Sequence, residues 1–190
     1  MKIEQVDDLG RLYQVSEVFP DTIVNQILSL DWEALPWNRE NQQEMWARKS
    51  IDKYAVPVLL KASEYIAKMY PWFEERFGIK FEFPPNAGNT NWWVDLPGFT
   101  TPMHTDGELP MSMQLYFIGS PELGTAFFKH RTPESIWKKF EFKPNTGYVM
   151  LNGPLPDGSQ PLHWHEMMTP VPQNSIRVSS YTVFSQYSNK

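Results

Sequence analysis

The chain contains no cysteine, which excludes disulfide bonds, thiolate metal sites and a cysteine nucleophile. Its formal net charge is -5 and its basic residues form no dense run, so duplex nucleic acid is not an expected partner. It has no apolar run near the roughly 20 residues that a helix needs to span a bilayer. Residues 1–8 are too charged for a signal peptide. These absences predict a soluble, cytoplasmic protein without a nucleic-acid or membrane partner.

The chain is rich in the residues that build and interrupt short strands. Its 190 residues are enough for one domain with a sizeable core, and 15% of them are aromatic. Its 17 prolines and 10 glycines indicate many short elements joined by turns. This composition favours a mainly β fold over a helical bundle.

The first part of the chain, residues 1–78, is expected to be largely helical after a strand at 12–15. Asp21 is a suitable N-cap for a helix that continues to Leu30. A longer helix is expected over 56–76, where Pro71 should kink it or divide it in two and Gly78 should end it.

From residue 79 to 190 the pattern changes to short strands between turn signals, which predicts a β-barrel core. The expected strands are 79–83, 90–95, 101–106, 112–118, 124–129, 138–143, 146–151, 161–166 and 175–187. The expected turns are 84–86, 96–98, 119–121, 144–145 and 156–158. Helices followed by many short strands predict a jelly roll with the helices packed on one sheet.

One histidine and one aspartate are placed to bind a metal ion together. His104 and Asp106 are two residues apart, so on an extended segment their side chains point to the same face. A second histidine would complete the two-histidine, one-carboxylate set that holds Fe(II) and leaves coordination positions open. His163 and His165 both qualify, because they also share a face of an extended segment.

A late Arg-x-Ser sequence is suited to binding a carboxylate. Arg177 and Ser179 share a face of the expected strand with Tyr181. An arginine buried in a barrel without a partner would cost several kcal/mol, which a bound carboxylate offsets through charge-assisted hydrogen bonds.

At these residues the chain resembles the Fe(II)/2-oxoglutarate-dependent dioxygenases, in particular their prolyl-4-hydroxylase-like branch. The resemblance covers residues 89–185 and includes the segments 91–98 and 124–128. It implies a double-stranded β-helix (jelly roll) and the cofactors Fe(II), 2-oxoglutarate and O₂, with ascorbate in support. It also implies hydroxylation of a substrate with release of succinate and CO₂.

The resemblance assigns the site residues as well. It implies that iron binds His104, Asp106 and His165, because a Pro-Val segment and then a basic residue follow His165 as they do in the family. His163 would then lie behind the ligands or at the entrance. Arg177 and Ser179 would hold the distal carboxylate of 2-oxoglutarate.

The chain also departs from relatives of this family. The prolyl hydroxylases of this branch usually have lysine where Arg177 stands, and nucleic-acid demethylases have a second arginine where Val183 stands. Related halogenases lack the carboxylate that Asp106 supplies. The strand before the motif often provides a tyrosine or asparagine to 2-oxoglutarate, but Trp93 and Asp95 occupy those positions here.

Two other functions remain open on the sequence alone. One is a cupin-like metal-binding protein, although Thr169 stands where that pattern requires glutamate. The other is a non-catalytic jelly-roll interaction module. The oligomeric state is not indicated, and the substrate is open among small metabolites, amino acids and protein side chains.

Overall fold

The computed structural model describes residues 1–37, 47–107, 109–153 and 163–189. The α-helices are α1 (Asp21–Leu28), α2 (Pro57–Lys68) and α3 (Tyr70–Phe77), and the short 3-10 helices are η3 (Lys53–Ala55), η4 (Ala87–Asn89), η5 (Pro121–Leu123) and η6 (Pro133–Ser135). The strands are β1 (Lys2–Gln5), β2 (Leu12–Ser16), β3 (Arg48–Ser50), β4 (Ile79–Phe81), β5 (Thr90–Asp95), β6 (Met111–Ile118), β7 (Thr125–Phe128), β8 (Ile136–Phe140), β9 (Thr146–Leu151), β10 (Trp164–Met167), β11 (Arg177–Phe184) and β12 (Tyr187–Asn189).

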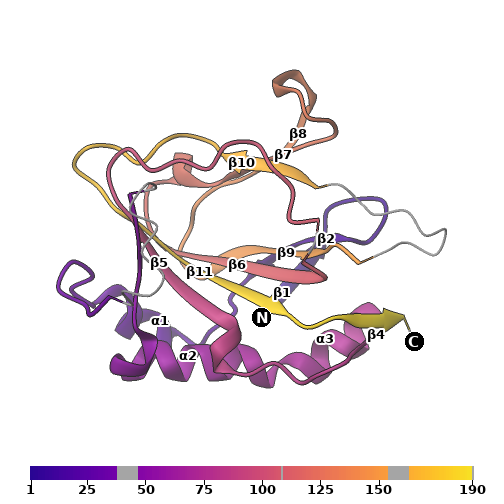
Figure 1. Cartoon of the computed structure of the whole chain (residues 1–190), viewed down its shortest axis with the longest axis horizontal. Helices are drawn as coiled ribbons and strands as arrows, with labels where there is room; N and C mark the ends of the chain where they lie inside the picture. The colour runs from indigo at the N-terminus through magenta and orange to yellow at the C-terminus, as the bar shows by residue number, and fades with distance from the viewer. Residues whose placement is uncertain (38–46, 108, 154–162, 190) are drawn as a thin grey trace.

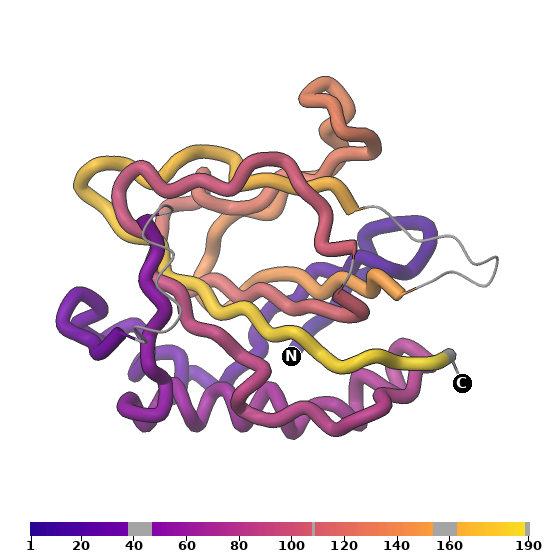
Figure 2. Tube along the Cα trace, viewed as in Figure 1, coloured from indigo at the N-terminus to yellow at the C-terminus, as the bar shows by residue number. Residues whose placement is uncertain are grey.

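Two antiparallel sheets face each other, and the helices cover the outer face of the larger one (Figure 1). The larger sheet has the strand order β1-β2-β9-β6-β11-β5-β3, and the smaller has the order β10-β7-β8. The Cα trace shows the same layers and places β12 beside β4 next to α3 (Figure 2). This arrangement confirms the predicted mainly β jelly roll with helices packed on one sheet.

The central strand β6 shows why both faces of the large sheet are covered. Its side chains alternate between the two faces, and most of them are buried. Met113, Leu115 and Phe117 pack with the helices in one apolar cluster. Tyr116 points to the other side, where it joins aromatic residues of both sheets such as Phe127. The interior between the sheets is therefore well packed at one end.

The helices follow the sequence prediction, although α1 ends at Leu28 instead of the expected Leu30. The expected long helix divides into α2 and α3, with Pro71 in the first turn of α3, and Gly78 ends α3 with φ 65. The prediction of Asp21 as N-cap is wrong. Asp21 is the first helical residue and Pro20 occupies the cap position, without a side-chain cap hydrogen bond. No described helix has the length and apolar character needed to cross a membrane.

Some predicted strand boundaries are also wrong. The segment 101–106 is not a strand: it meets β10 at an isolated antiparallel bridge between His104 and His165 and at a backbone hydrogen bond of 3.3 Å from Met167 N–H to the Thr101 carbonyl oxygen. Pro102 lacks an N–H donor, which limits pairing of this segment. The expected strand 138–143 is β8, shifted toward the N-terminus, and the expected strand 175–187 divides into β11 and β12. The turn expected at 156–158 and the first residues of the strand expected at 161–166 lie outside the described residues.

The N-terminal part also adds strands that the sequence pattern did not predict. β1 pairs with β2 at one end of the large sheet, and β3 pairs with β5 at the other. β3 is only Arg48-Lys49-Ser50, a short polar segment without a strand-like pattern. Its pairing places Arg48 directly opposite Asp95.

Candidate metal centre

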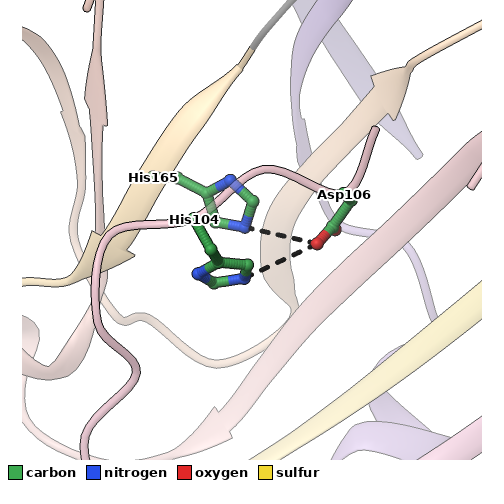
Figure 3. A group of neighbouring side chains, drawn as sticks. All are labelled: His104, Asp106 and His165. Carbon is green, nitrogen blue, oxygen red and sulfur yellow. Dashed lines mark ion pairs between the residues drawn. The ribbon is translucent and has the colours of Figure 1, made fainter. Parts of the chain in front are cut away.

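The three residues expected to bind a metal lie together at one end of the space between the sheets. His104 and Asp106 belong to the loop before β6, and His165 belongs to β10. Asp106 Oδ1 is 3.5 Å from His104 Nε2 and 3.9 Å from His165 Nε2. The ligand atoms all lie within 4.8 Å of one another, and the side chains point toward a common centre (Figure 3). These three residues could hold one metal ion.

The backbone fixes both imidazoles in the orientation that a metal requires. His104 Nδ1 is 2.7 Å from the carbonyl oxygen of Pro102, and His165 Nδ1 is 2.8 Å from that of His163. A carbonyl oxygen can only accept a hydrogen bond, so Nδ1 carries the proton in both rings. The lone pair is then on Nε2, which faces Asp106 in each case.

Asp106 is oriented by a tyrosine that sequence reasoning did not assign to the site. The Tyr181 hydroxyl donates a hydrogen bond of 2.5 Å to Asp106 Oδ2, which leaves Oδ1 toward the two histidines. Burial and the negative charge of Asp106 raise the pKa of Tyr181 well above its usual value. Tyr181 therefore remains a hydrogen-bond donor at neutral pH. The sequence signal that could have assigned Tyr181 to the site is its spacing, because Arg177, Ser179 and Tyr181 are each two residues apart and share one face of the strand.

The two histidines differ in exposure. The side chain of His165 is 5% exposed and that of His104 is 41% exposed, so the centre lies near the mouth of the cavity. Burial lowers the pKa of His165 to about 4, although the charge of Asp106 opposes this shift. His165 is therefore neutral at pH 7, as a metal ligand must be.

His163 lies outside this group of ligand atoms. Its Nδ1 is 3.3 Å from Asn152 Oδ1, and its Nε2 is 3.6 Å from Asp7 Oδ2. Asn152 Nδ2 in turn lies 3.4 Å from the backbone oxygen of Asp106. His163 thus connects β10 to the loop that carries Asp106, and its ring nitrogens face groups other than the candidate centre.

A cavity of about 260 Å³ opens beside the candidate centre. The polar residues around it include the three candidate ligands and two arginines, Arg48 and Arg177, and the apolar residues include one tryptophan. The lining residues are Arg48, Trp93, Thr101, His104, Asp106, Leu109, Gln114, Thr125, Tyr148, His165, Glu166, Met167, Arg177 and Tyr181. The structure therefore places Arg177 in the same cavity as the candidate metal ligands.

Arg177 is buried, as expected, but it has a partner within the protein. It is 1% exposed, its Nη1 donates to Asp95 Oδ2 at 2.6 Å, and its Nε donates to the carbonyl oxygen of Leu123 at 3.0 Å. The carboxylate of Asp95 therefore offsets part of the cost of burying Arg177, and the predicted contact of Arg177 with 2-oxoglutarate stays a prediction. Neither contact uses Nη2.

Ser179 is fully buried and, among the described residues, does not line the cavity. Gln114 Nε2 lies 3.5 Å from its hydroxyl oxygen, and Gln114 does line the cavity. The predicted contact of Ser179 with 2-oxoglutarate stays a prediction.

No protein-family model matches the chain, and no curated protein resembles it in sequence. Solved structures do match. A prolyl-4-hydroxylase from Pseudomonas putida has a TM-score of 0.61 and 16% identity, with 92% of each chain covered. An oxidoreductase of the 2OG-Fe(II) oxygenase family from Burkholderia pseudomallei has a TM-score of 0.59 and 13% identity, with 92% of this chain and 84% of that chain covered.

EvdO2 from Micromonospora carbonacea var. aurantiaca has a TM-score of 0.52 and 12% identity, with 100% of this chain and 95% of that chain covered. At these identities the likeness concerns the fold, and the site has to be judged from its own geometry. The chain shares the jelly-roll fold of a prolyl-4-hydroxylase and of a member of the 2OG-Fe(II) oxygenase family.

Proposed function

We propose that the protein is an Fe(II)- and 2-oxoglutarate-dependent oxygenase that hydroxylates a substrate with release of succinate and CO₂. The observation that supports this proposal most strongly is the set of residues that line one cavity. Two imidazole Nε2 atoms and one carboxylate oxygen converge there, and the same cavity is lined by Arg177. The shared fold adds support, because one matching structure is a prolyl-4-hydroxylase and another is a member of the 2OG-Fe(II) oxygenase family.

The donor set fits Fe(II). Two neutral imidazoles and one carboxylate bind a divalent first-row metal on one side and leave the remaining positions open. When bound, the iron would supply the activation of O₂ that the oxidation requires. The set contains no thiolate, and the partly exposed His104 lines the cavity in which a substrate would bind.

The residues of the chain have separate tasks in this proposal. His104, Asp106 and His165 hold the metal, and the Tyr181 hydroxyl donates a hydrogen bond to Asp106 Oδ2 so that Oδ1 remains available. Arg177 binds the distal carboxylate of 2-oxoglutarate, with Ser179 in support.

Hydroxylation is the reaction we propose because Asp106 fills a coordination position that a halide would otherwise need. Its carboxylate is held by Tyr181 and is turned toward both histidines, so it is built into the centre. The proposed substrate is a small molecule, an amino acid or a protein side chain.

One observation favours a second candidate function, a cupin-like metal-binding protein that does not use 2-oxoglutarate. The ion pair between Arg177 and Asp95 gives the arginine a partner without any bound cosubstrate. In that case the protein would bind a divalent metal but would show no metal-dependent affinity for 2-oxoglutarate.

The two candidates separate in a simple measurement. Purified protein is loaded anaerobically with Fe(II) and then exposed to O₂, ascorbate and 2-oxoglutarate, and succinate is followed over time. The oxygenase should release succinate slowly without its substrate and faster when a screened metabolite or peptide is the substrate. His104→Ala should abolish the release. Metal uptake without any succinate, across a broad substrate panel, would favour the cupin-like function.

A further inference from the structure

Three charged residues from distant parts of the chain form a row across the large sheet. Arg48 on β3 and Arg177 on β11 both stand opposite Asp95 on β5, which lies between them. Arg48 Nε is 2.5 Å from Asp95 Oδ1, and Arg48 Nη2 is 3.1 Å from Asp95 Oδ2. Arg177 Nη1 is 2.6 Å from the same Oδ2. Two guanidinium groups therefore meet on one carboxylate.

The row carries more positive than negative charge. Asp95 is fully buried, and its single charge cannot neutralise both arginines. Both arginines also line the cavity beside the candidate metal centre. Glu166 lines the cavity too, but no ion pair joins it to either arginine within the described residues. This end of the cavity is therefore suited to one further anion.

The guanidinium of Arg48 is held in a fixed position. Its Cζ lies 4.1 Å from the ring centroid of Phe99 and 5.0 Å from that of Trp93. Its side chain is only 17% exposed, and Asp95 fixes it through two nitrogen atoms. A planar fork that is already ordered loses little entropy when it binds a carboxylate.

We propose that Arg48 is a second carboxylate-binding residue of the cavity. Arg48 and Arg177 together hold the distal carboxylate of the cosubstrate, and Asp95 is the positioning residue that aligns both guanidinium groups. This inference rests on the proposed function for the identity of the ligand, 2-oxoglutarate. It also gives a role to Asp95, which stands where the family resemblance calls for a tyrosine or asparagine.

The test compares two ligands that differ only at the distal end. In 2-oxopentanoate a methyl group replaces the distal carboxylate of 2-oxoglutarate. Both are titrated anaerobically by calorimetry into Mn(II)-loaded protein, so that no turnover occurs. Arg48→Gln should lower the affinity for 2-oxoglutarate by about tenfold or more, as expected for a lost hydrogen bond to a charged group. The affinity of the same variant for 2-oxopentanoate should barely change.

Lys49→Gln is the matched control. It removes the same charge from the next residue of β3, where Lys49 Nζ lies over the ring of Trp37 at 3.6 Å and is not part of the cavity lining. It should bind both ligands as the wild type does. Arg48→Lys retains the charge but loses the fork, so it should bind 2-oxoglutarate with intermediate affinity.

A third ligand, glutarate, separates this inference from the proposed function. Metal-free wild type should bind glutarate through its carboxylates, and Arg48→Gln should weaken that binding. If Mn(II) does not strengthen 2-oxoglutarate binding, the proposed function fails, and the glutarate comparison alone decides the role of Arg48. An unchanged affinity of Arg48→Gln for both dicarboxylates would overturn the inference. The inference would also be overturned if Arg48→Gln lost as much affinity for 2-oxopentanoate as for 2-oxoglutarate, or if the wild type bound no dicarboxylate at all.

Discussion

The hydroxyl of Tyr181 donates a hydrogen bond to a carboxylate oxygen of Asp106, a residue 75 positions earlier in the chain. Tyr181 lies on β11, the strand that also carries Arg177, whereas Asp106 lies in the loop before β6. This hydrogen bond connects the candidate metal centre to the strand that carries the candidate cosubstrate arginine. Tyr181 also lines the cavity, so it contributes to the centre and to the space where ligands would bind.

Tyr181→Phe should weaken metal binding without unfolding the protein. The substitution removes only the hydroxyl, and Asp106 Oδ2 loses its donor while the ring still fills the same volume. Loss of such an outer partner typically lowers metal affinity roughly 10–100-fold. Anaerobic Fe(II) titration measures the effect, and Tyr54→Phe at an exposed position is the control. Wild-type affinity in Tyr181→Phe would show that Asp106 needs no such support.

His165→Ala should abolish tight Fe(II) binding, and His163→Ala should retain most of it. Of these two histidines, His165 presents Nε2 to Asp106, whereas both ring nitrogens of His163 face Asn152 and Asp7. His104→Ala and Asp106→Ala should behave like His165→Ala. The same titration checks all four variants. Loss of binding in His163→Ala with retention in His165→Ala would reverse the ligand assignment.

The metal-free protein should lose stability as the pH falls from 6.5 toward 4. Burial lowers the pKa of His165 from 6.5 to about 4, so in this range the unfolded state binds more protons than the folded state. Above pH 6.5 the ring is neutral in both states and makes no such contribution. His165→Gln cannot titrate there, so its stability relative to wild type should rise as the pH falls. Urea unfolding at pH 7 and pH 5 measures the difference in unfolding free energy between wild type and His165→Gln. If this difference is the same at both pH values, the lowered pKa of His165 is contradicted.

Arg177→Ala should weaken 2-oxoglutarate binding by roughly 2–5 kcal/mol, the range for truncating one member of a buried charge pair. Part of this cost arises because Asp95 loses one of its two arginine partners. Ser179→Ala should cost about 1 kcal/mol, since it removes one neutral hydrogen-bonding group. Calorimetry with Mn(II)-loaded protein measures both variants. Wild-type affinity for 2-oxoglutarate in both variants would contradict the proposal that Arg177 and Ser179 bind the cosubstrate.

The sequence predicted those parts of the fold and site that depend on local pattern. Pro71 and Gly78 divide and end a helix for backbone reasons that act within one turn, and both effects appear in the structure. Arg177 and Tyr181 share the cavity face because side chains alternate along a strand.

The remaining features depend on contacts between distant segments. Arg48 enters the cavity only because β3 pairs with β5, and nothing in its three-residue strand indicates that pairing. Asp95 becomes the partner of two arginines through pairing on both sides of β5. The choice between His163 and His165 depended on which ring faces Asp106, and an alternating pattern cannot decide that for two residues of the same face.

In the proposed function, the metal centre and Arg177 act on one cosubstrate. The affinity for 2-oxoglutarate tests this proposal when it is measured with and without Mn(II) under anaerobic conditions, in wild type, His165→Ala and Arg177→Ala. Tight binding is expected only when the metal, His165 and Arg177 are all present. Binding of 2-oxoglutarate that is equally strong without metal, or equally weak in all three proteins, would contradict it.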